Sequence, residues 1–202
     1  MDYAELFERI LGQVDHKAYL PLADVVDPHQ KEGMRKIENA IRDPDETPED
    51  CEETIRQLHA RGEIDVVHML SALHVLAASP KVNDLRLAAQ YATEQEMAAL
   101  EIGGPRLQYN LASVERHRGV LAYLQSHYDV ALDYFSRAFE RQHSAGNLSN
   151  VLATLVRLGD VSEARKLAAQ VRRSLSSELI ADLNHIIAQD PDLALLRPEA
   201  TL

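Results

Sequence analysis

Apolar residues recur along most of this chain three or four positions apart, the spacing of an amphipathic α-helix. The first such stripe lies in residues 2–14 and the second in residues 30–42. Between them, residues 15–29 contain two prolines and predict an irregular or briefly helical connection. No segment alternates at period two for long enough to predict a strand. The pattern therefore predicts an all-α fold.

An acidic run opens the next predicted helix. Residues 43–53, DPDETPEDCEE, contain seven acids and no base. Thr47 as N-cap, Pro48 at the first helical position and Asp50 in the first turn indicate a helix start. The acids then lie near the positive end of the helix dipole, which stabilises them. A solvated, capped helix start explains the run better than an acidic binding patch, and the run lacks the glycine-containing loop of a calcium site.

Seven further helices follow, separated by Gly, Pro and Asn. Their predicted ranges are 63–78, 84–102, 105–125, 128–143, 148–158, 161–173 and 176–189, and a tail follows at 191–202. The first of them is the most apolar, so we expect it to be buried on several sides. Predicted N-terminal caps are Asn83, Ser126 with Asp129, and Asp160 with Glu163, and residues 145–147 predict a break in the chain.

Two helical segments repeat at an offset of 33 residues. The offset aligns Ala131 with Ala164, and Phe135 with Ala168. Small and large residues at this period resemble the tetratricopeptide repeat. In the first unit, the residues at the repeat's packing positions are Gly119, Tyr123, Tyr128, Ala131, Phe135 and Ala138. In the second, the segment from Leu158 to Ala164 resembles the turn between the two helices of a repeat.

The chain also departs from that pattern. Glu115 stands at the usual Trp position, Ser126 at the usual turn Gly, and no Pro closes the second helix. The resemblance covers residues 115–172 and extends more weakly over 63–114. It implies antiparallel helix pairs stacked as a short right-handed superhelix, capped by the last helix. The alternative is an unrelated helical bundle with one chance repeat.

This resemblance divides the chain into three parts. Residues 1–62 form an acidic N-terminal helical region packed on or preceding the array, residues 63–190 form the array with its capping helix, and residues 191–202 form a tail. Its packing residues have no chemistry of their own, so function is expected on the concave surface that stacked helices create.

Charge narrows the range of partners. The net charge is −11, and its excess is N-terminal, because residues 1–101 carry 21 acids and 10 bases whereas residues 102–202 carry 11 of each. Such a field repels nucleic acid and anionic membranes. No apolar run approaches a membrane span and no secretory signal is visible. Cys51 is the only cysteine, which fits a reducing compartment, so a cytoplasmic location is expected.

No motif predicts catalysis, a metal or a cofactor. Glu140 and His143 form one Glu-x-x-His, where di-metal bundles need two with further glutamates. His68 and His74 lie six positions apart on different helix faces. Acids around Cys51 oppose thiolate formation. The glycine pair at 103–104 lacks a phosphate-binding pattern.

The remaining expectation is a protein–protein interaction adaptor or scaffold that binds a protein or peptide. By the resemblance, the residues facing its groove are Arg116, Val120, Tyr123, Ser149, Asn150, Ala153 and Arg157. Two arginines with a tyrosine suit an acidic segment, and homo-oligomerisation stays open. One alternative is a regulatory or sensor protein whose N-terminal helices switch on ligand binding. A less favoured alternative is a helical enzyme or metal protein.

Overall fold

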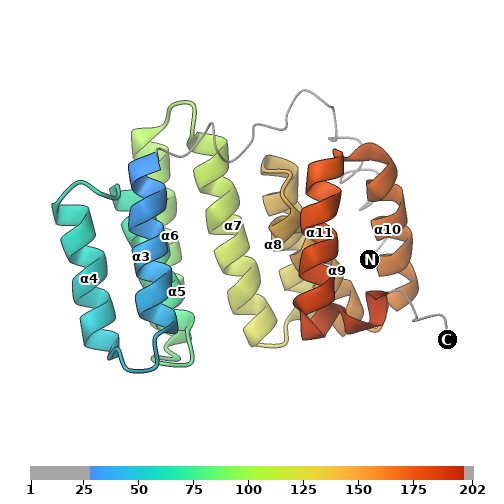
Figure 1. The fold of residues 1–202 in the computed structure, drawn as a ribbon, viewed down its shortest axis with the longest axis horizontal. Coiled ribbons are helices and arrows are strands. Elements are labelled where there is room, and N and C mark those ends of the chain that lie inside the picture. Colours follow the sequence, from blue (N-terminus) through green and yellow to red (C-terminus); the bar gives the residue numbers. More distant parts are fainter. Residues whose placement is uncertain (1–27, 198–202) are drawn as a thin grey trace. The chain divides into compact units, whose positions relative to one another are not determined.

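The computed structural model of this chain describes residues 28–197 (Figure 1). Within that range there are nine α-helices, one 3-10 helix and no β-strand, so the all-α prediction is confirmed. The chain divides after Leu121 into two compact units, here called the N-terminal unit (residues 28–121) and the C-terminal unit (residues 122–197). The predicted helix at 2–14 and most of the predicted connection at 15–29 lie outside the described residues.

Five helices build the N-terminal unit. They are α3 (Pro28–Arg42), α4 (Pro48–Ala60), α5 (Val66–Ala78), α6 (Leu85–Ile102) and α7 (Leu107–Leu124), whose last turn enters the C-terminal unit. Helix α5 packs against α3, α4 and α6. As its composition predicts, it is buried on most sides, with nine of its 13 residues buried.

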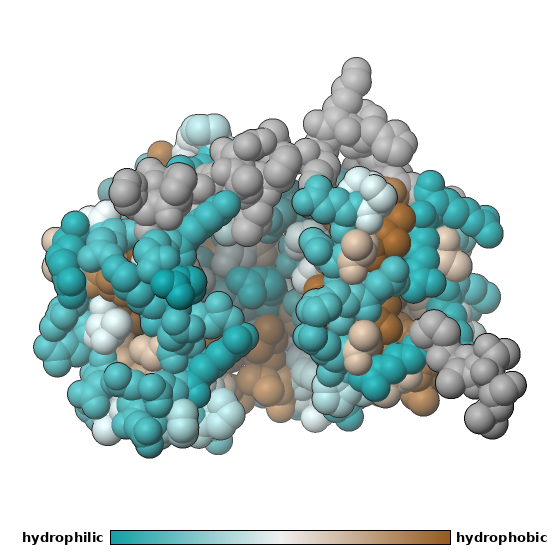
Figure 2. All heavy atoms as spheres, viewed as in Figure 1, coloured by the Kyte–Doolittle hydropathy of each residue, from teal (hydrophilic) through white to brown (hydrophobic). Residues whose placement is uncertain are grey.

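The first three of these helices share one core. Ile37 from α3, Ile55 from α4 and Leu73 from α5 are each at most 2% exposed and belong to the same apolar cluster. The outward surface of α3 and α4 is mostly hydrophilic (Figure 2). The boundary predicted after residue 62 therefore falls inside a single packed core.

Hydrogen bonds of the helix cap and of Lys81 stabilise the connection between α3 and α4. The Thr47 Oγ1 accepts a hydrogen bond from the Asp50 amide and the Asp50 carboxylate accepts one from the Thr47 amide, so the predicted helix start is confirmed as a full capping box. The ammonium of Lys81 donates to the carbonyls of Ala40, Asp43 and Glu46. A cation among the carbonyls that follow a helix C-terminus satisfies groups that the helix leaves unpaired.

The C-terminal unit is organised around one apolar helix. It contains α8 (Tyr128–Arg141), α9 (Ala145–Arg157), α10 (Val161–Ser174), α11 (Ser177–Gln189) and the 3-10 helix η1 (Pro191–Leu196). Helix α9 packs against α8, α10, α11 and η1. Its Leu148, Leu152 and Leu155 are 0% exposed. Ala131, Phe135 and Ala138 of α8, predicted as packing residues, are likewise buried.

Several predicted helix ends are wrong, each for a local reason. Asp84, not Asn83, caps α6, because Asn83 adopts a φ of 53° in the preceding turn. Ser126 does not cap α8, because its φ of 62° places it in a left-handed turn. Asp160 is the N-cap residue of α10, yet its side chain makes no capping bond to the helix, so the predicted capping box is absent.

Two other boundaries differ from expectation. Residues 145–147, predicted as a break, are instead the first turn of α9, which begins three residues earlier than predicted. The Ser144 hydroxyl accepts a hydrogen bond from the Asn147 amide and so caps the helix there. The predicted tail contains η1, whose Leu193 is 0% exposed. This apolar anchor explains why the chain continues to pack after Pro191.

Candidate functional site

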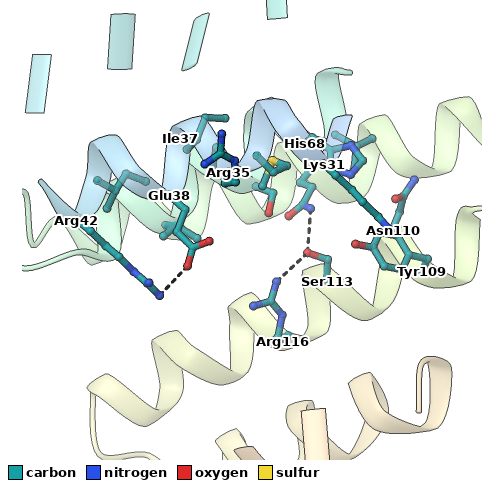
Figure 3. A pocket seen from close by; sticks show the side chains of 17 residues that line it. Lys31, Arg35, Ile37, Glu38, Arg42, His68, Tyr109, Asn110, Ser113 and Arg116 are labelled. Atoms are coloured by element: carbon teal, nitrogen blue, oxygen red, sulfur yellow. Dashed lines mark hydrogen bonds and ion pairs between the residues drawn. The ribbon is translucent and has the colours of Figure 1, made fainter. Parts of the chain in front are cut away.

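A solvent-open cavity of about 690 Å³ lies within the N-terminal unit, lined by α3, α5 and α7 with one residue from α6 (Figure 3). We call it the α3–α5–α7 cavity. Met34 and Ile41 of α3 and Val67 and Val75 of α5 supply apolar lining. Helix α7 supplies polar lining. The cavity therefore has an apolar side and a polar side, the composition of many ligand sites.

The polar side consists of residues one helical turn apart on α7. Asn110, Ser113 and Arg116 stand at i, i+3 and i+6, so their side chains follow one face of the helix. Tyr109 precedes them and also lines the cavity. Figure 3 shows these side chains together along α7, opposite the residues of α3.

Hydrogen bonding leaves this side rich in donors. The Ser113 Oγ accepts from the Gln95 Nε2 at 3.4 Å and from the Arg116 Nη2 at 3.5 Å, so its own hydrogen is free to donate. Asn110 is 5% exposed, and its amide has no hydrogen-bond partner within residues 28–197. The Asn110 side chain lines the cavity, and its amide atoms are not among the buried polar atoms that lack a partner, so a ligand in the cavity can reach them.

Arg116 gives the cavity its electrostatic character. Removal from water lowers the pKa of its guanidinium, and the nearby Tyr109 hydroxyl opposes this only weakly. No carboxylate within residues 28–197 forms an ion pair with Arg116, and its bond to Ser113 is long. A partly desolvated cation without a counter-ion is costly, because its lost hydration is not replaced.

The cations of α3 are placed differently. Arg35, Glu38 and Arg42 line the cavity with exposed side chains, and both arginines are paired: Arg35 with Glu32 at 2.8 Å and Arg42 with Glu38 at 2.6 Å. Lys31 is exposed and lines the cavity, and Figure 3 shows it extending toward the end where Tyr109 and Asn110 lie. Arg116 is therefore the cation that lines the cavity from its buried side.

A pair of buried histidines lies behind the polar side. The rings of His74 and His117 stack with centroids 4.0 Å apart, and each residue is 1% exposed. The His117 Nδ1 donates to the Gln95 Oε1 at 2.9 Å, which leaves its Nε2 to accept from the Ser71 hydroxyl at 3.4 Å. Burial holds the pKa of His117 well below its usual range and lowers that of His74 to about 4. Both rings are neutral near pH 7.

This network is suited to holding a ligand rather than to reacting with one. Ser71, His117 and Gln95 follow the order of nucleophile, base and orienting group, but the serine–histidine contact is long and burial weakens the imidazole as a base. Their hydrogen bonds instead fix Gln95, which in turn positions Ser113. The network thus supports the polar side of the cavity.

The structure distributes the predicted groove residues over both units. Arg116 lines the α3–α5–α7 cavity of the N-terminal unit, and the half-buried Val120 follows on α7. Tyr123 and Arg157 meet within the C-terminal unit, where the Arg157 Nε donates to the Tyr123 hydroxyl at 3.1 Å. Both also bind Asp192 of η1, a residue that lies in the predicted tail and was not predicted to belong to a site.

The contacts with Asp192 reduce the positive charge that Arg157 could present to a partner. The Asp192 carboxylate accepts a hydrogen bond from Tyr123 and forms an ion pair with Arg157, so the charge of that arginine is already compensated. Burial and the bond to Asp192 raise the pKa of Tyr123 to about 12. These contacts attach η1 to α9 and the end of α7.

The other predicted groove residues present little surface. Ser149 and Ala153 are 6% and 7% exposed, and the Ser149 hydroxyl donates to the Gly146 carbonyl within α9. Asn150 is half-buried, and its carbonyl accepts from the Thr154 hydroxyl. The buried side chains of Ser149 and Ala153 therefore leave little surface for a partner.

Candidate reactive groups elsewhere lack the surroundings that reactivity needs. Cys51 is 0% exposed and burial raises the pKa of its thiol, with Glu46 and Asp50 adding to the rise against the opposing charge of Lys81. Across residues 28–197, no group of three or more His, Cys, Asp or Glu side chains converges as a metal site. In the same range, no helix is both long and apolar enough to cross a bilayer.

Comparison with known proteins adds no assignment. No protein-family model, curated protein or solved structure matches this chain. The site must therefore be interpreted from its own geometry.

Proposed function

We propose that this chain is a non-enzymatic interaction protein whose α3–α5–α7 cavity receives a segment of a protein or peptide partner. The observation that carries the proposal is Arg116, a partly desolvated cation that lines an open cavity with no acid of residues 28–197 paired to it. A partner that supplies the missing acid gains a charge-assisted hydrogen bond at a site already partly dehydrated.

The apolar side of the cavity supports a peptide-like ligand. Met34, Ile41 and Val75 give it apolar surface directly across from the donors of α7. A segment with alternating acidic and apolar side chains can satisfy both sides at once, as grooves between helices do for amphipathic peptides. This keeps the sequence-based expectation of an acidic partner and moves its site from the predicted repeat groove to this cavity.

Comparative capture tests the proposal. Lysate from the source organism is passed over the wild-type chain, the R116Q variant and the R86Q variant, and the captured proteins are quantified. Arg86 is exposed on α6 and does not line the cavity, so its variant loses the same charge elsewhere. Proteins held by wild type and R86Q but lost from R116Q support the proposal, and identical captured sets contradict it.

A second pair of variants tests whether the partner binds in the cavity, because each variant adds one acid, either inside the cavity or outside it. Val75 lines the cavity and is 42% exposed, whereas Met97 is 65% exposed and does not line it. V75E should release an acidic partner by repulsion, and M97E should retain it. Release by both variants to the same extent would indicate binding over another surface.

A second candidate function is regulatory, with α3 as the element that responds. Helix α3 belongs to the predicted switch region at 1–62 and supplies one wall of the cavity. A captured partner should then slow amide exchange in α3 as well as in α7. Protection confined to α5 and α7 would count against switching and leave simple binding.

A further inference from the structure

We infer that Asn110, Ser113 and Arg116 form a carboxylate subsite at the polar side of the α3–α5–α7 cavity. This inference rests on the proposed function, because it names the chemical group that the cavity recognises. It depends on three features of α7: a cation without an acid partner, an amide that lines the cavity and makes no hydrogen bond within residues 28–197, and a hydroxyl whose hydrogen is uncommitted.

The directions of the hydrogen bonds favour an anion over a cation or a neutral group. Ser113 already accepts two bonds, from Gln95 and Arg116, so it is available to a ligand as a donor. Arg116 has donors only, and the Asn110 amide has two more. A ligand atom that meets all three must therefore be an acceptor, and a negatively charged oxygen compensates Arg116 as well.

A carboxylate suits the site better than a phosphate. Phosphate carries close to two charges near neutral pH and is usually held by several cations. Arg35 and Arg42 line the cavity but are already paired with Glu32 and Glu38, and Lys31 is exposed, which leaves Arg116 as the cation on the buried side. One guanidinium with two neutral donors matches the single charge and two oxygens of a carboxylate.

The part of the ligand that is attached to the carboxylate should be apolar. Ile37, Ala72 and Val75 line the same cavity from α3 and α5. An aliphatic chain that enters beside them removes apolar surface from water while the acid binds α7. A free aliphatic acid and a glutamate flanked by leucines both carry this chemistry, and the experiment below separates them.

The experiment follows hexanoate binding by the chemical shifts of the backbone amides of α7 and of the arginine Nε groups. Hexanol serves as the neutral comparison, and inorganic phosphate as the alternative anion. Wild type should respond to hexanoate with shifts at Asn110, Ser113 and Arg116, and R116Q should bind it about tenfold more weakly or worse. Binding of hexanol or phosphate as tight as that of hexanoate would overturn the inference.

Further variants guard against misfolding and identify the source of the acid. R116K keeps the charge but not the planar fork, so its affinity should fall between those of wild type and R116Q, whereas R86Q should bind as wild type does. A capped amphipathic peptide with a central glutamate is compared with its glutamine counterpart. Preference for the glutamate peptide over hexanoate assigns the site to protein partners, and the reverse assigns it to small acids.

The two proposals fail in different ways. If hexanoate binding depends on Arg116 while lysate capture does not change in R116Q, the carboxylate subsite stands and the proposed function fails. If capture depends on Arg116 but hexanoate and both peptides bind without preference for the acid, the carboxylate subsite is wrong and partner binding stands.

Discussion

The stacked histidines predict that the N-terminal unit loses stability as the pH falls from about 6.5 to about 4. Burial lowers the pKa of His74 to about 4, even though its Nδ1–H donates to the Ala88 carbonyl at 2.9 Å and this bond favours the charged form. In the unfolded chain the same imidazole takes up a proton near pH 6.5. Between these values the unfolded state binds more protons, so folding weakens as the pH falls.

The size of this effect follows from the pKa difference. The gap between 6.5 and about 4 corresponds to about 3 kcal/mol, because each pKa unit is worth about 1.4 kcal/mol. The contribution is fully present above pH 6.5 and is lost as the pH falls through the range. His117 adds a loss of the same sign, since burial lowers its pKa as well.

The measurement is the free energy of amide exchange in α5 and α6 at several pH values, corrected for the intrinsic pH dependence of exchange. In H74Q the slope of stability against pH should flatten while that of H127Q, which removes an exposed histidine, stays as in wild type. The slope is the readout because H74Q itself also changes the absolute stability. An unchanged slope in H74Q, or a His74 imidazole that titrates near pH 6.5, would refute the reasoning.

Three further predictions concern stability. T47A should destabilise α4 by about 1 kcal/mol through loss of its cap, measured by amide exchange in α4, and an exchange pattern equal to wild type would contradict the cap. L152A should destabilise the C-terminal unit by about 2–5 kcal/mol, because Leu152 is 0% exposed in α9, and a change below about 1 kcal/mol would show that the site collapses around the gap. Y123F should raise amide exchange in η1 by removing the hydrogen bond to Asp192, with an effect of about 1 kcal/mol, and unaltered exchange there would show that this hydrogen bond does not stabilise η1.

The sequence predicted those features that depend on neighbouring residues. The α4 start is confirmed because Thr47 and Asp50 need only each other to form the capping box. The predicted cap residues of α6 and α8 are each one position too early, although α8 begins at residue 128 as predicted. Asn83 and Ser126 take positive φ values, which the turn geometry decides and the order of residue types does not.

The site was only partly predictable. The repeat resemblance named Arg116 as a candidate, but it did not name the residues beside it, Asn110 and Ser113. Asn110, Ser113 and Arg116 are three positions apart in the sequence, and this spacing places polar residues along one face of a helix. Gln95 and Asp192 could not be found in this way, because each meets its partners across tens of residues of chain or more.

Comparison of the arginines within this chain indicates why Arg116 points to function. Arg118, two positions further along α7, is half-buried and forms an ion pair with Glu96 at 2.7 Å, and Arg157 forms one with Asp192. Arg118 follows the general rule that a cation withdrawn from water is compensated by an acid, and even the exposed Arg157 has an acid partner. Arg116 is withdrawn from water without an acid of residues 28–197, and replacing it with a neutral residue would remove a cost to folding. A residue that is unfavourable for folding and lines an open cavity is best explained by a ligand that compensates its charge, so R116Q should stabilise the free N-terminal unit while it weakens binding of the acid about tenfold or more.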